Sequence, residues 1–202
     1  MKISLVMPTI NVTTELDLFL KSLKAQTYKD FELIVVDQNE GNEVFEIVKD
    51  YEEDFKIKYV KSDEKGLSLN RNRGLILMKG EVVGFPDDDC EYQPDTLEKV
   101  VKFFKENEDK RIYSCRTLER GKDYGTGIMS EKNLKLTKGN IEKTVKSITF
   151  FVNYTFEDII LFDENLGVGS VFGSGEETDY VLTLLHKGYK GEYFADDIIF
   201  HP

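Results

Sequence analysis

The segment VVGFPDDDC, residues 82–90, joins a short apolar run directly to three consecutive carboxylates. The run from Val82 to Phe85 predicts a short buried strand that stops at Pro86. Asp87, Asp88 and Asp89 then follow the end of that strand. This arrangement predicts an acidic loop at one edge of a sheet.

Strands and helices alternate through the first half of the chain. Further apolar runs predict strands over 3–7, 31–36 and 56–60. Helical spacing of apolar residues predicts helices over 14–26, 43–53, 67–79 and 94–107. This alternation with short connections is typical of an α/β domain, and we expect a mostly parallel central sheet flanked by helices.

The second half is less regular, but neither a linker nor a repeat divides it from the first, so we expect one domain over 1–202. Residues 118–146 are polar and weakly patterned. The strands expected here are 111–117, Ile148–Val152, Ile159–Phe162 and one or two short strands within Glu192–Phe200, and a helix is expected over 176–187.

Acidic residues follow two separate predicted strands, because Asp37 ends the strand over 31–36 just as the three aspartates follow theirs. In a parallel sheet the carboxyl ends share one edge, where ligands of open α/β sheets bind. A divalent cation would relieve the repulsion among the three carboxylates and could clamp a diphosphate. The alternatives are a solvated turn that caps the helix near 94, and an ordinary loop acid at Asp37.

The formal net charge of −11 opposes binding to nucleic acid or to anionic lipid. An acidic protein that holds a phosphate compound needs local positive charge, and a metal ion is the usual source. No apolar run approaches the roughly 20 residues of a membrane span, and the N-terminus lacks the features of a signal peptide, so a cytoplasmic location is expected.

Three other groups of residues carry candidate chemistry. Arg71 and Arg73 form a basic cluster that suits a phosphate or a base, or equally surface ion pairs. The segment GSGEETD, residues 173–179, offers a carboxylate as general base, although acids also favour helix starts. His201 is a metal-ligand candidate, although a lone histidine is more often structural. The glycine-rich fingerprint of dinucleotide sites is absent after the first strand, where Pro8 and Thr9 stand instead.

Together these segments resemble family 2 of the inverting glycosyltransferases, which have the glycosyltransferase-A (nucleotide-diphospho-sugar transferase) fold. The resemblance covers nearly all 202 residues and depends on the order and spacing of its motifs more than on any one of them. Its segments are SLVMPTIN (4–11), FELIVVD (31–37), LNRNRG (69–74), DDDC (87–90), FDENLG (162–167) and GSGEETDY (173–180).

The resemblance implies roles for these residues. Residues 1–117 would form a nucleotide-sugar-binding half and 118–202 an acceptor-side half. The donor site would contain Pro8, Thr9, Asp37, Arg71, Asp87 and Asp88, and Asp89 with Asp87 and His201 would bind Mn²⁺ or Mg²⁺. The base would be Glu177, with Glu176 or Asp179 as alternatives, because the family position usually holds Asp.

The implied activity is metal-dependent, inverting transfer of a hexose-type sugar from a nucleoside-diphosphate sugar, with UDP favoured. The acceptor would be a glycan or lipid-linked saccharide, as in polysaccharide biosynthesis. A missing C-terminal region would add peripheral association with the inner face of the plasma membrane. A nucleotidyltransferase and a module that only binds the nucleotide sugar are the alternatives.

Overall fold

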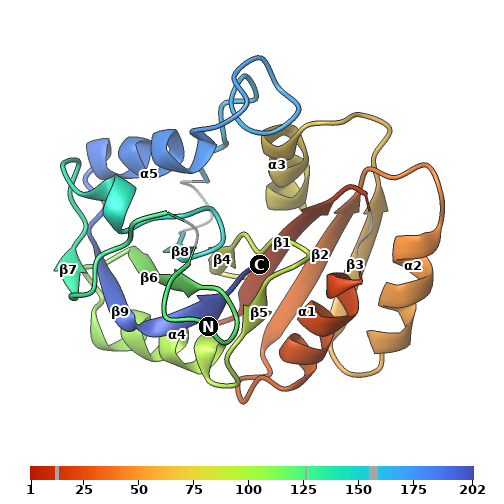
Figure 1. Ribbon diagram of the computed structural model, residues 1–202, viewed down its shortest axis with the longest axis horizontal. Helices are drawn as coiled ribbons and strands as arrows, with labels where there is room; N and C mark the ends of the chain where they lie inside the picture. Colours follow the sequence, from red (N-terminus) through yellow and green to blue (C-terminus); the bar gives the residue numbers. More distant parts are fainter. Residues whose placement is uncertain (12–13, 126, 155–158) are drawn as a thin grey trace.

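The computed structural model describes residues 1–11, 14–125, 127–154 and 159–202. Within them the strands form one curved sheet in the order β3-β2-β1-β4-β8-β6-β9-β5, with β7 paired to β9 (Figure 1). The strands are β1 Ile3–Thr9, β2 Phe31–Asp37, β3 Lys56–Lys61, β4 Val82–Gly84, β5 Glu91–Tyr92, β6 Ile112–Leu118, β7 Leu134–Lys135, β8 Phe150–Asn153 and β9 Gly191–Phe200. The helices are α1 Glu15–Lys24, α2 Glu43–Val48, α3 Leu67–Leu77, α4 Thr96–Glu106 and α5 Glu176–His186, with short 3₁₀ turns η1 Lys49–Tyr51 and η2 Ile141–Lys143.

The first half confirms the predicted parallel arrangement, since β3, β2, β1 and β4 pair in parallel. Their side chains alternate between the two faces of the sheet, as strand geometry requires. In β2, Leu33 and Val35 enter one core, whereas Ile34 and Val36 enter the other. Both faces of the sheet are therefore apolar, and each needs a layer of helices to cover it.

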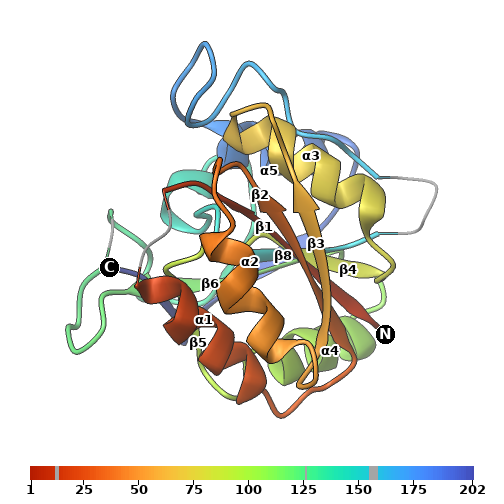
Figure 2. The same cartoon turned by 90° about the vertical axis from the view of Figure 1, so that its right-hand side faces the viewer.

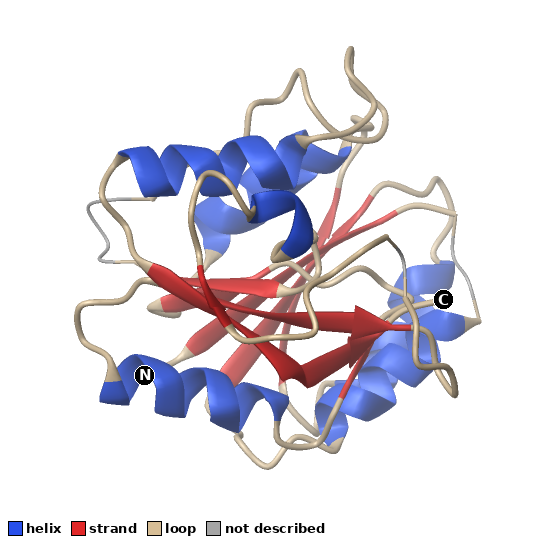
Figure 3. Cartoon of the chain, turned by 60° about the vertical axis from the view of Figure 1, so that its left-hand side comes forward, coloured by secondary structure: helices blue, strands red, loops and turns tan. Residues whose placement is uncertain are grey.

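Helices cover the two faces unequally. The core on one face includes side chains of α1, α2 and α4, among them Phe19, Val44 and Phe104. The core on the other face includes Leu75 of α3 and Leu184 of α5. Figures 2 and 3 show the resulting three layers, with the sheet between α3 and α5 on one side and α1, α2 and α4 on the other.

The second half makes the sheet mixed. β8 runs antiparallel to both β4 and β6, and β9 pairs in parallel with β6 and antiparallel with β5 and β7. Instead of one or two short strands, β9 is a single ten-residue strand. Its register with β6 shifts between Cys115 and Arg116, which explains why no clean alternation marks it in the sequence.

The prediction of a strand over Ile159–Phe162 is wrong, because the structure has no strand there. Phe162 is buried, but the segment is held by a side chain instead of a neighbouring strand. Asn72 of α3 donates a hydrogen bond to the Phe162 carbonyl at 3.0 Å and accepts one from the Phe162 amide at 2.8 Å. Ile159, Ile160 and Phe162 therefore pack into the core that α3 covers, whereas Leu161 is 50% exposed, and the segment has no strand partner among the described residues. Residues 155–158 of the same predicted β-rich region lie outside the described residues.

The carboxyl ends of β1, β2, β4 and β9 lie at one edge of the sheet. The carboxyl ends of β1 and β2 are adjacent, because Thr9 pairs with Asp37. β4 and β9 run in the same direction, since β8 is antiparallel to β4 and to β6 while β9 is parallel to β6. His201 follows β9 directly and therefore reaches the same edge as Asp87, three residues beyond β4.

Candidate active site

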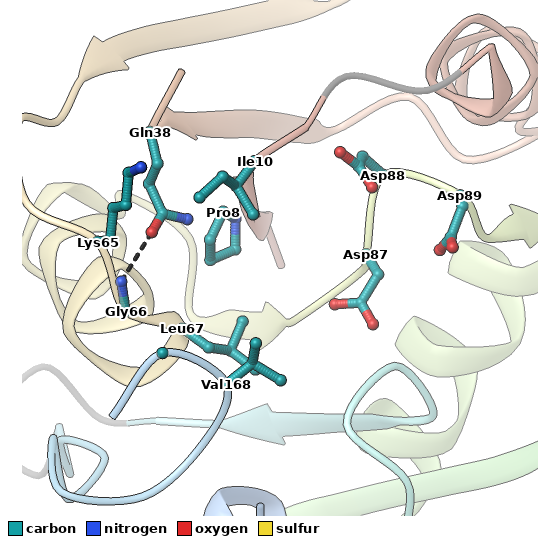
Figure 4. Close-up of a pocket in the computed structure, with 11 residues that line it drawn as sticks. Pro8, Ile10, Gln38, Lys65, Gly66, Leu67, Asp87, Asp88, Asp89 and Val168 are labelled. Carbon is teal, nitrogen blue, oxygen red and sulfur yellow. Dashed lines mark hydrogen bonds between the residues drawn. The ribbon is translucent and has the colours of Figure 1, made fainter. Parts of the chain in front are cut away.

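A cavity of about 310 Å³ opens at this edge, and we call it the first cavity. One wall is formed by the end of β1 and by residues just after β1 and β2, and another by the start of α3 and a later loop (Figure 4). Its lining consists of Pro8, Ile10, Gln38, Lys65, Gly66, Leu67, Asp87, Asp88, Asp89, Val168 and Gly169. The first cavity is thus built mainly by the first half, but two residues of its lining come from the second.

The three aspartates point in different directions. Asp88 accepts a hydrogen bond from the hydroxyl of Thr9, while Asp87 and Asp89 face the other side (Figure 4). Burial and the neighbouring carboxylates raise the pKa of Asp88 to about 6. Burial also raises the pKa of Asp87, and Asp89 adds to this by repulsion. The segment therefore carries a concentration of negative charge that a cation would stabilise.

Asp87, Asp89 and His201 form the metal-ligand cluster. One potential ligand atom from each lies within 4.8 Å of the others. His201 Nε2 is 3.2 Å from Asp89 Oδ1, and this contact lowers the pKa of Asp89 and raises that of His201. Two carboxylate oxygens and one imidazole nitrogen suit Mn²⁺ or Mg²⁺. The residues present therefore fit a divalent cation.

Arg71 lies behind this cluster and is fully buried. Its guanidinium contacts Asp87 Oδ1 at 3.3 Å and Glu176 Oε1 at 3.2 Å. The rings of Phe85 and Phe162 lie 6.0 and 5.4 Å from its central carbon, within the range of cation–π attraction. Its Nε has no hydrogen-bond partner among the described residues. Arg71 thus holds two carboxylates in place and does not line the first cavity.

Asp37 is also fully buried, and the first cavity is lined by its neighbour Gln38 instead. Lys61 Nζ and the amide of Asn39 donate hydrogen bonds to Asp37 at 2.9 Å each, and the hydroxyl of Tyr59 donates another. Burial raises the pKa of Asp37, but these hydrogen bonds outweigh it and leave the pKa below its usual value. These hydrogen bonds therefore favour the ionised form of Asp37 and hold its side chain in place.

A second cavity of about 230 Å³ lies beside the start of α5. Its lining includes Glu176 and Glu177 together with two members of the metal-ligand cluster, Asp87 and His201. Glu176 is occupied by Arg71, whereas Glu177 is half-buried, and burial together with repulsion from Glu176 raises its pKa. Asp179 is exposed and, among the described residues, does not belong to the lining of either cavity.

Several lining residues carried no signal in the sequence. Gln38 accepts a hydrogen bond from the amide of Gly66 at 2.9 Å and so joins two walls of the first cavity (Figure 4). Gly66 has a φ of 139°, a conformation that only glycine adopts readily. Val168 and Gly169 arrive from a loop about 100 residues later in the chain. Among these residues, only Gly66 has a recognisable sequence signal, because it stands just before a predicted helix.

The arrangement supports a defined chemistry. A cation at the metal-ligand cluster would lie between the two cavities, because Asp89 lines the first, His201 the second and Asp87 both. A phosphate compound in the first cavity could therefore share that cation, with Glu177 within the second cavity as a proton acceptor.

No helix within residues 1–11, 14–125, 127–154 and 159–202 combines the length and apolarity that a membrane crossing requires.

Comparison with known proteins finds glycosyltransferases among the proteins that this chain resembles. The chain is 32% identical over 146 residues to the poly(ribitol-phosphate) beta-N-acetylglucosaminyltransferase TarP of Staphylococcus aureus, covering 70% of this chain and 43% of that protein. It is 29% identical over 195 residues to a GalNAc(5)-diNAcBac-PP-undecaprenol beta-1,3-glucosyltransferase of Campylobacter jejuni, covering 93% and 61%. S. aureus TarS 1–349 in complex with UDP-GlcNAc shares the fold, with a TM-score of 0.78 at 22% identity over 99% of this chain and 58% of that one.

The extent of these matches differs between this chain and its relatives. The chain spans 31%, 15% and 43% of the lengths of the first three curated relatives that it matches. The sequence model of glycosyl transferase family 2, in contrast, matches residues 4–163, most of this chain. The chain therefore belongs to glycosyl transferase family 2, with the glycosyltransferase-A fold.

Proposed function

We propose that this chain is the donor-binding and catalytic region of a metal-dependent, inverting glycosyltransferase. It would move a sugar from a nucleoside-diphosphate sugar, with UDP favoured, to a hydroxyl of a glycan or lipid-linked saccharide. Family membership and the UDP-GlcNAc complex of TarS support the donor class.

One observation carries the proposal. Asp87 and His201 of the metal-ligand cluster share the second cavity with Glu177, while Asp87 and Asp89 also line the first cavity. A donor seated in the first cavity with its diphosphate at the cluster would present its sugar toward Glu177. This is the order of groups that displacement of a diphosphate by an activated hydroxyl requires.

The residues of the chain have distinct parts in such a reaction. Glu177 accepts the proton of the acceptor hydroxyl, which attacks the anomeric carbon on the face opposite the diphosphate and inverts it. Its raised pKa brings it closer to neutrality, where a general base is most effective. Arg71 orients Asp87 and Glu176. Asp87, Asp89 and His201 would hold a cation, which would stabilise the negative charge of the departing diphosphate.

Metal-dependent donor binding is tested by thermal unfolding with UDP and Mn²⁺, added separately and together. The pair should raise the melting temperature more than the sum of the two single additions. Asp89→Asn should abolish that gain, and the control Asp196→Asn, an exposed position on β9, should retain it. An equal gain with Asp89→Asn would remove the cluster from the donor site.

The base is tested by comparing Glu177→Gln with Asp179→Asn. We expect Glu177→Gln to reduce transfer by about 10²- to 10⁴-fold, the contribution of general base catalysis, with UDP affinity unchanged. Asp179→Asn should stay near wild type because its side chain is exposed. The reverse order of effects would assign the base to Asp179, and full activity in both variants would exclude Glu177 and Asp179 as the base.

The acceptor class is proposed from the relatives. One acts, by its name, on a poly(ribitol-phosphate) polymer and another on an undecaprenol-linked saccharide. Transfer of radiolabelled sugar to a soluble polymer and to a lipid-linked oligosaccharide in detergent would separate the two. Labelling of neither, with donor hydrolysis intact, would contradict both acceptor classes.

A further inference from the structure

Two residues line both cavities. Comparison of the two linings gives only Asp87 and Val168 in common among the described residues. Asp87 is polar and belongs to the metal-ligand cluster. Val168 is apolar and comes from the loop between Phe162 and α5. These two side chains therefore lie at the boundary where the first cavity adjoins the second, and we call this boundary the passage.

The backbone at Val168 is fixed, although its side chain is 66% exposed. The amide of Leu67, the first residue of α3, donates a hydrogen bond to the Val168 carbonyl at 2.9 Å. The hydroxyl of Ser68 donates another to the Leu166 carbonyl at 2.6 Å. A Cβ on Gly169 would lie 3.3 Å from Gly66 Cα, so the two segments meet with glycine on both sides. The loop is thus seated on the start of α3.

Figure 4 shows the consequence, with Val168 beside Leu67 and opposite Asp87 at the end of the first cavity. A side chain on a fixed backbone has a defined reach into the passage. The isopropyl group of Val168 can neither donate nor accept a hydrogen bond. It can therefore discriminate between ligands only by size and by contact with their apolar parts.

We propose that Val168 is a specificity-determining residue for the transferred sugar. This inference rests on the proposed function. In that reaction the anomeric carbon lies between a diphosphate at the metal-ligand cluster and a hydroxyl beside Glu177, which places the sugar in the passage. A sugar substituent that faces Val168 meets a small apolar wall, so a bulky substituent such as an acetamido group fits only as far as that wall allows.

The experiment compares Val168→Phe and Val168→Ala with Val171→Phe. Val171 lies in the same loop, is 77% exposed, and is absent from the described lining of both cavities, so it controls for added aromatic surface. Calorimetric titration in Mn²⁺ measures the affinities for UDP, UDP-glucose and UDP-N-acetylglucosamine. Because Val168 is exposed, all three variants should unfold at nearly the wild-type temperature.

Val168→Phe should weaken at least one UDP-sugar by about tenfold or more, and UDP-N-acetylglucosamine more than UDP-glucose, while UDP itself changes less than about twofold. Val168→Ala should narrow the difference between the two sugars. Val171→Phe should resemble wild type.

Three outcomes would overturn the inference. Equal weakening of UDP and both UDP-sugars by Val168→Phe would make Val168 a wall for the nucleotide. Unchanged affinity for all three ligands would show that the sugar lies elsewhere. If the wild-type protein bound neither UDP nor the UDP-sugars, the proposed function would fail and this inference with it, a result distinct from the first two.

Discussion

Replacement of Arg71 by methionine removes the charge that two carboxylates share while keeping most of the side-chain volume. In the folded protein Arg71 is fully buried and contacts Asp87 at 3.3 Å and Glu176 at 3.2 Å. Without it, Asp87 and Glu176 both lose their ion-pair partner, although His201 still lowers the pKa of Asp87. We expect the variant to fold less stably and to bind Mn²⁺ with altered affinity.

The size of the effect follows from burial. Removing one partner of a buried ion pair costs about 3–5 kcal/mol, because the other partner stays buried without compensation. The Glu176 side chain is 7% exposed, but that of Asp87 is 33% exposed, so water offsets part of the loss there. We therefore expect a decrease of about 3 kcal/mol in the free energy of unfolding at neutral pH.

The stability that Arg71→Met loses should also depend on pH. Burial raises the pKa of Asp87, and Arg71 is the leading influence that lowers it, so the variant should show a still higher pKa. A carboxyl whose pKa is raised in the folded state favours folding only when protonated, so its penalty is absent at low pH and grows as pH rises. The difference between Arg71→Met and wild type should accordingly be smaller at about pH 5 than at about pH 8.

Urea unfolding followed by circular dichroism measures the free energy of unfolding of each variant and its change with pH. Arg73→Met is the matched control, since Arg73 stands on the same helix but is 31% exposed and pairs with an exposed Glu64. Exposed pairs contribute about 0–1 kcal/mol, so the control should change little. If Arg71→Met cost no more than Arg73→Met, or if its cost did not vary with pH, the account of Arg71 as a shared counter-charge would be wrong.

Three further predictions concern other parts of the fold. Because the pKa of Asp37 is lowered, its ionised form stabilises the folded state above its usual pKa of 3.8. The difference in free energy of unfolding between wild type and Asp37→Asn, measured in urea, should therefore shrink as the pH falls below 3.8. A difference that does not change with pH would contradict this prediction. Gly66→Ala should cost about 1–3 kcal/mol because of its φ of 139°, whereas Gly139→Ala, with no heavy atom within 4 Å of the added Cβ, should change the melting temperature little. Gly84→Ala would place a Cβ 2.5 Å from the Phe151 ring and should lower the free energy of unfolding by about 1–3 kcal/mol. Adding Phe151→Leu should recover part of that loss. If Gly84→Ala lowers the stability equally with and without Phe151→Leu, overpacking against Phe151 is excluded.

The first half of the fold was predictable because its signals are local. The apolar run that ends in Asp37 and the one that precedes Asp87 each specify a buried strand, and their alternation with helices specifies parallel pairing. From that pairing the sequence predicted that Asp37 and the three aspartates would share one sheet edge, and the structure confirms it. His201 also reaches this edge, through a strand that no sequence pattern marks clearly.

The rest of the site depends on contacts between distant segments. Nothing near Arg71 in the sequence shows that it is buried between Asp87 and Glu176, because the latter lies 105 residues away. Similarly, Val168 stands in a glycine-rich segment that looks like an ordinary loop, and its carbonyl meets α3 only in the folded chain. The prediction of a strand over Ile159–Phe162 is wrong for the same reason, since the distant Asn72 satisfies the backbone of Phe162.

The attachment of His201 has a consequence for how tightly any cation is held. Its amide bonds to the Leu118 carbonyl at 3.0 Å, and the neighbouring β5 strand that pairs with this end of β9 has only two residues. The hydrogen bond to Leu118 is the last one of the β6·β9 ladder, and the end of a ladder can fray without unfolding the domain. Each opening would withdraw one of three ligands, so measured affinity would fall with the fraction of time the ladder is closed. Amide hydrogen exchange at His201, slowed by Mn²⁺ if the ligand assignment holds, would report that equilibrium directly.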